Sequence, residues 1–208
     1  MTGSPWVGID GYTRDIPRIQ AFYRRVLGPI ADGIVFRPCD PGLAPPRWVG
    51  FVGGVDRQAL GDTLIDHGGV ELAADGSRRI WLDPWGAILG GADARPAIDA
   101  PTVQLELAAR DVPRALGFYR EWLGASVRDG CLWLGDGLLG RVRAAAPTEA
   151  AEWHAWFSVP DPAAACDRAL ADGARRLADP DGRIWLTDPA GCPFGLAAGS
   201  TAPVGGGS

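Results

Sequence analysis

The chain has 208 residues, a formal net charge of −5 and a hydrophobic content of 47%. This length and composition allow two small domains, each able to bury a core. The 20 Lys and Arg residues are scattered among 25 Asp and Glu residues, so a nucleic-acid-binding face is not expected. No apolar run approaches the roughly 18 residues of a membrane span, and no signal segment is recognisable. We therefore expect a cytoplasmic protein with no nucleic-acid or membrane partner.

The two halves of the sequence repeat one another. Asp15-Ile16-Pro17-Arg18 returns as Asp111-Val112-Pro113-Arg114, and Phe22-Tyr23-Arg24 returns as Phe118-Tyr119-Arg120. Matches at one constant offset predict two related domains joined head to tail. The predicted divisions are a shortened N-terminal domain at 4–97, a C-terminal domain at 101–198 and a flexible tail at 199–208.

Each half is expected to open with a short alternating strand, Trp6–Tyr12 or Val103–Ala109. An aspartate in a helix-capping position, a proline in the first turn and apolar residues at helical spacing follow each strand. They predict a helix that ends at Gly28 in the first half and at Gly124 in the second.

A second strand is expected at Trp48–Val52 and at Trp153–Phe157, each followed by an aspartate and a helical stretch. Two short strands then close each half on either side of an Asp-Pro-x-Gly turn. Their expected ranges are 79–82 and 87–89, then 183–186 and 192–196. Because fewer residues separate the first helix from the second strand in the first half, one wall of the first domain is predicted to be shortened.

The motif Asp-hydrophobic-Pro-Arg-(x)3-Phe-Tyr-Arg-(x)2-Leu-Gly after an opening strand, with Asp-Pro-x-Gly before the last strand, resembles the vicinal oxygen chelate superfamily. That superfamily includes glyoxalases, extradiol dioxygenases, fosfomycin-resistance enzymes and bleomycin-binding proteins. The resemblance covers the chain to about residue 197 and implies an α+β fold of two tandem glyoxalase-like domains. Each would pair two βαβββ units, with a curved mixed sheet forming a ligand-binding cup. Such folds host unrelated chemistries, so no single activity is implied.

The resemblance also implies where a metal would bind: on the two opening strands of a domain and at a glutamate of its final strand. In the first domain these positions hold Gly8, Val49 and Gly90. In the second domain they hold Gln104, His154 and Gly195. Three protein ligands are typical of a catalytic metal site, so no metal and no other cofactor is expected. The alternative is a divalent metal held by Gln104 and His154 together with Glu106, which shares a strand face with Gln104.

Two acids occupy equivalent positions on the opening strands, Asp10 in the first half and Glu106 in the second. Both are expected to point into their cups, where a carboxylate needs a donor or acquires a raised pKa. One hypothesis makes Glu106 and His154 a catalytic acid/base pair. The other is that Glu106 only fixes a histidine or an arginine. Asp10, which shares a strand face with Tyr12, has the same two interpretations.

Nine tryptophans are a high number for this length, and several fall in expected strands. Trp156 shares a strand face with His154, so it is expected to line the second cup, with Trp133 and Trp185 as neighbours. A flat conjugated ligand could stack on such a wall. The alternative is that the repeated tryptophans fill equivalent cores of the two halves, namely Trp48, Trp153, Trp81 and Trp185.

Two functions stay open. The first is a binding protein that encloses an aromatic natural product or antibiotic in a metal-free cup, as antibiotic-sequestering members of the superfamily do, in resistance or biosynthesis. Its ligand-binding residues would be Gln104, Trp156, Trp133, Trp185 and Tyr12. The second is an enzyme, either a metal-independent isomerase, cyclase or lyase using Glu106 and His154, or a variant metal-dependent glyoxalase-like or dioxygenase-like enzyme. The partner is a small molecule in both cases, and the chain is expected to be a monomer or a homodimer.

Overall fold

The computed structural model describes residues 6–39, 45–93, 103–147, 149–179 and 182–199. The predicted domain boundary and the predicted tail beyond Gly199 lie outside these residues. The first half contains β1 (Trp6–Thr13), α1 (Ile16–Leu27), η1 (Gly28–Gly33), β2 (Val35–Pro38), β3 (Arg47–Val52), α2 (Arg57–Asp66), β4 (Val70–Asp75), β5 (Arg78–Leu82) and β6 (Ile88–Ala92). The second half contains β7 (Val103–Ala109), α3 (Val112–Leu123), β8 (Ser126–Arg128), β9 (Cys131–Leu134), β10 (Gly137–Ala144), β11 (Glu152–Val159), α4 (Pro162–Ala171), β12 (Arg175–Arg176), β13 (Ile184–Thr187) and β14 (Pro193–Ala198).

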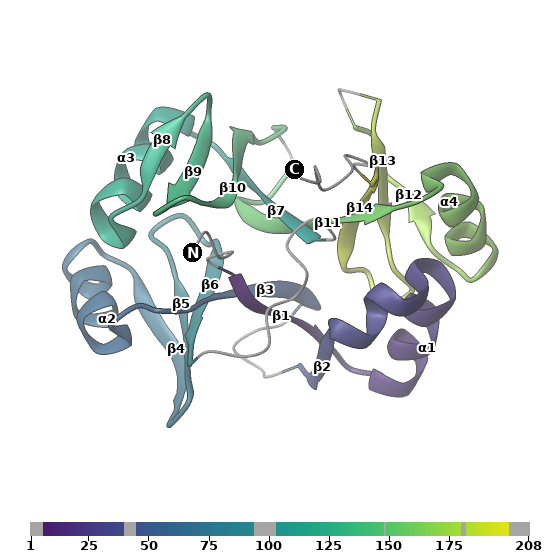
Figure 1. The fold of residues 1–208 in the computed structure, drawn as a ribbon, viewed down its shortest axis with the longest axis horizontal. Coiled ribbons are helices and arrows are strands. Elements are labelled where there is room, and N and C mark those ends of the chain that lie inside the picture. Colours follow the sequence, from purple (N-terminus) through teal and green to yellow (C-terminus); the bar gives the residue numbers. More distant parts are fainter. Residues whose placement is uncertain (1–5, 40–44, 94–102, 148, 180–181, 200–208) are drawn as a thin grey trace, which may run out of the picture.

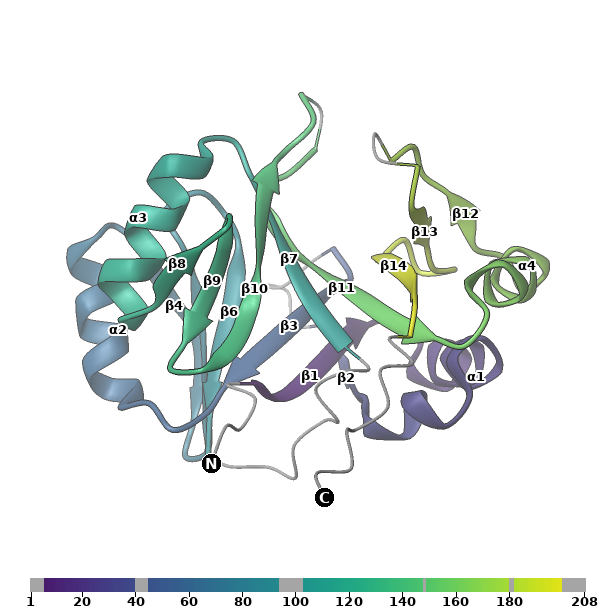
Figure 2. The same cartoon turned by 45° about the horizontal axis from the view of Figure 1, so that its top comes forward.

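The strands form two mixed sheets, one from each half. The first sheet has the order β2-β1-β3-β6-β5-β4, and the second has the order β12-β13-β14-β11-β7-β10-β9-β8. The two opening strands of each half are antiparallel neighbours, β1 with β3 and β7 with β11. The second sheet curls from β8 round to β12 (Figure 2). The predicted α+β fold of paired βαβββ units with curved sheets is confirmed.

Among the described residues the first sheet has the shorter wall. β2 runs parallel to β1 in the first sheet, as β10 runs parallel to β7 in the second. Outside β10 the second sheet continues through β9 and β8, whereas β2 is the edge of the first sheet among the described residues. The second half therefore has a hairpin that extends the wall of its cup.

The helices begin where the sequence places their caps. The carboxylates of Asp15, Asp111 and Asp161 each accept a hydrogen bond from the backbone N–H three residues later. Gly124 ends α3 in the left-handed conformation, with φ of 66°, which costs a glycine little. Local sequence thus fixes the ends of the helices that cover each sheet.

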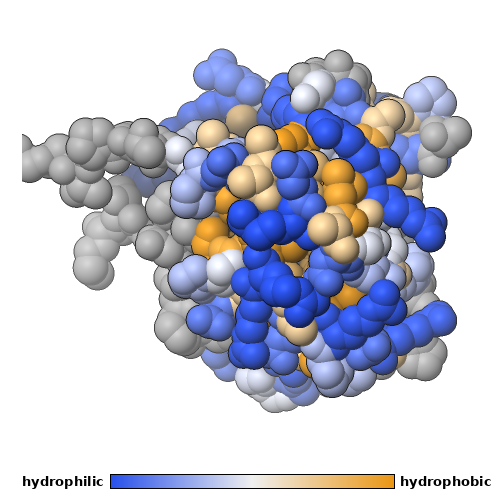
Figure 3. Space-filling view, turned by 90° about the vertical axis from the view of Figure 1, so that its right-hand side faces the viewer, coloured by the Kyte–Doolittle hydropathy of each residue, from blue (hydrophilic) through white to orange (hydrophobic). Residues whose placement is uncertain are grey.

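The two halves share one hydrophobic core. α1 of the first half lies beside α4 of the second, and α2 lies beside α3, so the helices meet at both ends of the molecule (Figure 1). A single cluster of buried side chains includes residues of both halves, among them Phe22, Val52, Leu107 and Phe157. At the end formed by α1 and α4, Arg25 Nε donates to Asp172 Oδ2 over 2.9 Å. Figure 3 views this end and shows hydrophilic residues over most of it, with apolar residues between them.

The tryptophans divide between this core and the second cup. Trp48 and Trp153 occupy equivalent positions in the shared core, as the packing interpretation predicts. Trp81 is also a core residue, whereas Trp185 stacks on Trp156 with ring centroids 5.1 Å apart. The predicted equivalence of Trp81 and Trp185 is therefore wrong.

The reason is a shift of one residue between β5 and β13. Trp81 and Trp185 follow the same Arg-Ile dipeptide, but an extra residue, Thr187, precedes the second Asp-Pro turn. Trp185 lies opposite Gly195 in its ladder, whereas Gly90, the counterpart of Gly195, lies opposite Ile80. A slip of one residue moves a strand's side chains to the other face of the sheet, so the second half gains an aromatic ring in its cup.

Two crossed hydrogen bonds connect the halves inside the core. Tyr23 of α1 donates to Asp188 Oδ2 over 3.1 Å, and Tyr119 of α3 donates to Asp83 Oδ2 over 2.8 Å. Each aspartate also accepts two backbone N–H groups within its own Asp-Pro turn through Oδ1. Burial raises the pKa of both aspartates and, more strongly, that of both tyrosines. Each half therefore holds the terminal turn of the other.

We expect Tyr119→Phe and Tyr23→Phe each to lower the free energy of unfolding by about 1–3 kcal/mol, because each leaves a buried carboxylate oxygen without its donor. Urea denaturation followed by circular dichroism measures the change. The exposed control Glu121→Gln, on the same helix as Tyr119, should stay within about 0.5 kcal/mol of the wild type. Tyrosine variants as stable as this control would show that the crossed pairs do not hold the halves together.

Candidate functional site

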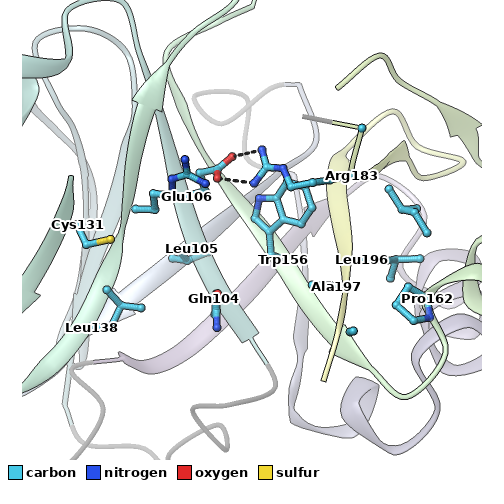
Figure 4. A pocket seen from close by; sticks show the side chains of 14 residues that line it. Gln104, Leu105, Glu106, Cys131, Leu138, Trp156, Pro162, Arg183, Leu196 and Ala197 are labelled. Atoms are coloured by element: carbon cyan, nitrogen blue, oxygen red, sulfur yellow. Dashed lines mark hydrogen bonds and ion pairs between the residues drawn. The ribbon is translucent and has the colours of Figure 1, made fainter. Parts of the chain in front are cut away.

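The centre of the second cup is a carboxylate held by two arginines. Glu106 of β7 is 3% exposed, and its Oε1 accepts a hydrogen bond of 2.7 Å from Arg143 Nε of β10. Arg183 precedes β13 and reaches across the cup, where its Nη1 donates to Oε2 over 2.7 Å (Figure 4). Burial opposes ionisation of this carboxyl, but the hydrogen bonds from Arg183 and Arg143 outweigh it and lower the pKa of Glu106. Glu106 is therefore held as a carboxylate.

The charge network continues through Arg143 to a second glutamate. Arg143 Nη1 donates to Glu149 Oε2 over 2.7 Å, and Arg183 also pairs with Asp179. His154 Nε2 lies 3.2 Å from Glu149 Oε1 but does not form a hydrogen bond with it. Both nitrogens of this buried histidine are consequently without a hydrogen bond among the described residues. Its ring stands edge-on to Trp185, with centroids 4.6 Å apart.

The indole of Trp156 lies beneath the Arg183 guanidinium and against Gly195. The guanidinium carbon is 4.1 Å from the ring centroid, a cation–π contact (Figure 4). A Cβ atom on Gly195 would lie 2.2 Å from the indole, so only glycine fits under the ring. Gly195 is the position that the resemblance gives to a metal-binding glutamate. An indole covers that position here.

The first cup contains the same arrangement. Asp10 is fully buried and accepts hydrogen bonds from Arg37 of β2 and from Arg78 of β5, the latter over 3.0 Å. Phe51 occupies the place of Trp156, and a Cβ atom on Gly90 would come within 2.4 Å of its ring. Arg78 lies over this ring as Arg183 lies over the indole, although more distantly at 5.9 Å. Both halves therefore combine an acid, two arginines and an aromatic ring over a glycine.

The rest of the two cups differs. The first cup is filled by a cluster of buried apolar residues, namely Tyr12, Val49, Phe51, Ile80, Ile88 and Ala92. In the second cup, His154 replaces Val49, and Trp185 replaces Ile80. Beside these residues the second cup has an open pocket of about 540 Å³. Its polar lining comes from Gln104, Glu106, Cys131, Arg141, Trp156 and Arg183, and its apolar lining includes Leu105, Leu138, Pro162, Ile184 and Leu196 (Figure 4).

The structure brings some of the predicted site residues together and separates others. Gln104, Glu106 and Trp156 line the pocket. His154 and Trp185 are buried beside it and do not line it. Trp133 of β9 lies under the Arg128 side chain and is not among the residues that line this pocket. Asp10 and Tyr12 are buried in the first cup.

The predicted acid/base pair is not formed. Glu106 and His154 lie opposite one another in the ladder, but Glu106 binds the two arginines and His154 approaches Glu149 instead. A carboxylate whose pKa is lowered by two guanidinium groups is a poor proton donor. The structural interpretation, in which Glu106 fixes an arginine, describes this geometry. Asp10 holds Arg37 and Arg78 in the same way.

Sequence reasoning missed the arginines. One signal was available, because Arg78 and Arg183 each stand five residues before the aspartate of their Asp-Pro turn. Aligning the repeat on that turn, instead of on the Arg-Ile dipeptide, pairs these two arginines. No comparable motif marks Arg141, Arg143 or Glu149, which lie in the longer wall of the second half and the segment that follows it.

A family model described as a glyoxalase-like domain matches residues 103–197. These residues span β7 to β14 and include both opening strands and both helices of the second half. Residues 103–197 therefore match a glyoxalase-like domain, in agreement with the resemblance that the repeated motifs carry. No curated protein matches the chain.

Solved structures share the fold of the whole chain. The Mn(II)-bound glyoxalase from Novosphingobium aromaticivorans has a TM-score of 0.59 at 14% identity, covering 94% of this chain and 82% of its own. The 2,2',3-trihydroxybiphenyl 1,2-dioxygenase from Sphingomonas wittichii strain RW1 has a TM-score of 0.57 at 12% identity, covering 93% and 90%. The 2,3-dioxygenase LapB from Pseudomonas sp. KL28 has a TM-score of 0.57 at 14% identity, covering 95% and 94%. At these identities the likeness shows the fold.

These comparisons correct the expectation that no cofactor is involved. A solved structure that shares the fold of this chain is an Mn(II)-bound glyoxalase, so a fold of this kind can hold a metal. The proposed alternative ligands do not fit a metal, however. Both oxygens of Glu106 accept hydrogen bonds from arginines, and Trp156 covers Gly195. Among the described residues no three His, Cys, Asp or Glu side chains form a metal-binding group.

No helix in the described part of the chain is both long and apolar enough to span a membrane.

We expect Gly195→Ala to lower the free energy of unfolding by about 1–3 kcal/mol, because its methyl group overlaps the indole of Trp156. In a Trp156→Ala background the same substitution should cost little. Gly117→Ala is the matched control, since that helical glycine has open space around its Cβ direction and alanine favours helices. Equal effects of Gly195→Ala in both backgrounds, measured by urea denaturation, would contradict the packing of the indole on this glycine.

We expect Glu106→Gln to lower stability at pH 7 by about 1–3 kcal/mol and to weaken its dependence on acid pH. The folded-state pKa of Glu106 is lowered, so its stabilisation is complete above the usual value of 4.5 and is lost as the pH falls through the folded-state pKa. The difference in the free energy of unfolding between wild type and variant should therefore become smaller below about pH 4.5. Urea denaturation at pH 3–7 measures it, with the exposed Glu121→Gln as control. A difference that is constant with pH would contradict the arginine-held carboxylate.

Proposed function

We propose that the glyoxalase-like domain binds a small molecule with an aromatic body in the pocket between β10 and β13, and that the first half is its structural support. The contrast between the two cups carries this proposal. At equivalent positions the first cup has Val49 and Ile80, which pack in an apolar cluster, whereas the second has His154 and Trp185 beside an open pocket.

The pocket has the size and lining of a small-molecule site. A volume of about 540 Å³ falls within the usual range for ligand pockets, and most of its exposed surface is apolar. Leu105, Leu138, Ile184 and Leu196 provide that surface, while a few polar groups converge at one side. An aromatic body matches such walls, and polar anchors fix its orientation. The proposal includes aromatic natural products and antibiotics, because the lining limits the size and polarity of the ligand but does not specify one chemical scaffold.

The comparisons support an aromatic ligand by analogy. The dioxygenase from Sphingomonas wittichii is named for a trihydroxybiphenyl, a molecule built of two aromatic rings. Trp156 does not present an open face to such a ring, because Arg183 and Gly195 cover it. The ligand would instead rest on the aliphatic side chains and meet the edge of the indole. Glu106 is not assigned a proton-transfer role in this proposal, since both of its oxygens are engaged by arginines.

We expect the neutral fluorescent probe N-phenyl-1-naphthylamine to bind saturably with one site per chain. Ala197→Phe, which places a ring inside the pocket, should weaken binding at least ~10-fold, the effect of losing about 1.4 kcal/mol. Ala73→Phe adds the same ring on exposed β4 of the first half and should leave binding unchanged. Fluorescence titration measures the dissociation constants, and circular dichroism checks that both variants fold. Absence of saturable binding, or equal binding by both variants, would contradict the proposal.

A further inference from the structure

We propose that the pocket selects an anionic ligand, an aromatic acid whose carboxylate binds Arg141 and the Nε1–H of Trp156. This inference rests on the proposed function, because it names the chemical class of the molecule that the pocket takes. Three features of the lining carry it: a cation that forms no ion pair with a described residue, a buried donor that has no acceptor among the described residues, and a carboxylate whose two oxygens both accept from arginines.

Arg141 is the cation. It stands on β10, where its partners across the two neighbouring strands are Glu106 of β7 and Cys131 of β9. Its register would suit an ion pair with Glu106, but that carboxylate is occupied by Arg143 and Arg183. Arg141 forms no ion pair within the described part of the chain, and its exposed side chain lines the pocket. A guanidinium in this place favours an incoming carboxylate, which it can bind through two parallel hydrogen bonds.

Trp156 provides the buried donor. Its side chain is 6% exposed and lines the pocket, and Nε1 has no acceptor among the described residues. Figure 4 shows the indole below Arg183 with its nitrogen on the side of β7, where Glu106 and Gln104 also stand. An indole N–H can only donate, so an oxygen of the ligand is the complement that this position lacks. Leaving a buried donor unpaired is costly, and a bound ligand would remove that cost.

The charged residues that line the pocket also favour an anionic ligand. The charged lining residues are Arg141, Arg183 and Glu106, two cations and one anion. The anion already accepts hydrogen bonds on both oxygens, so it offers little to a cationic ligand. Glu149 and Asp179 balance Arg143 and Arg183 from outside the lining. A ligand entering the pocket therefore meets donors and positive charge on its polar side and aliphatic side chains elsewhere.

Two probes with one aromatic body separate this inference from the proposed function. They are 1-anilinonaphthalene-8-sulfonate, which is an anion at all working pH values, and N-phenyl-1-naphthylamine, which lacks only the sulfonate. We expect the wild-type chain to bind the anionic probe at least ~10-fold more tightly than the neutral one, because a hydrogen-bonded charge pair is gained. Fluorescence titration at low salt measures both dissociation constants.

Single substitutions test which residues cause the preference for the anionic probe. Arg141→Gln should weaken binding of the anionic probe ~10-fold and change binding of the neutral probe less than ~2-fold. Arg120→Gln removes the same charge from an exposed site on α3 and should change neither. Trp156→Phe keeps a ring over Gly195, as Phe51 does over Gly90, and should weaken only the anionic probe, by a few-fold.

The outcomes are distinct. Preference for the anionic probe that disappears in Arg141→Gln supports an anion site. Equal affinity of both probes for the wild-type chain, or a preference that survives Arg141→Gln, overturns the anion site and leaves the proposed function standing. Failure of both probes to bind overturns the proposed function and this inference together.

Discussion

The crossed tyrosine–aspartate pairs are the constraint on which the rest of the structure depends. Tyr23 and Tyr119 are buried between the two sheets, where each hydroxyl must find an acceptor, and each finds it in the Asp-Pro turn of the opposite half. Because the aspartate also orders its own turn through two backbone N–H groups, one carboxylate fixes both the end of a strand and the position of a helix from the other half. These tyrosines and aspartates lie in the repeated Phe-Tyr-Arg and Asp-Pro-x-Gly motifs. Both motifs therefore contribute to the contact between the halves rather than to a cup.

A second repeated feature organises the cups. A buried carboxylate is stable only when donors compensate for its desolvation. Each cup supplies two arginines, one from the strand beside the acid and one from the far side of the cup, in β5 or just before β13. The arginine from the far side must cross the concave face to reach the acid, and it does so over an aromatic ring that lies on a glycine. The glycine, the ring and the arginine therefore pack together as one unit. This packing explains why Gly90 and Gly195 stand where a metal-binding side chain is implied by the resemblance.

Much of the fold could be predicted from the sequence, because the signals for strands, helix caps and turns are local and occur twice. Asp15, Asp111 and Asp161 cap helices at the predicted places, and the shortened wall follows from a missing segment. The site was harder, because the partners of Glu106 lie 37 and 77 residues away and no periodicity within a strand connects them. The misplaced tryptophan has a related cause. Successive side chains of a strand point to opposite faces of the sheet, so the extra Thr187 shifts β13 by one residue. Trp81 and Trp185 therefore point to opposite faces although they match in the sequence repeat.

The same packing unit occurs in one cup that is filled by apolar side chains and in another that has an open pocket. In the first cup, a cluster of buried aromatic and aliphatic side chains completes the packing beside the Asp10 network. In the second cup the wall is longer, and its extra strand β9 and neighbour β10 contribute Cys131, Leu138 and Arg141 to the pocket. The added strand β9 thus contributes Cys131 to the pocket, while Arg141 comes from β10 and forms no ion pair with any residue that the structure describes. Because Glu106 and its two arginines already hold one another by hydrogen bonds, a ligand in this pocket would have few further polar side chains to order, which limits the free-energy cost of binding.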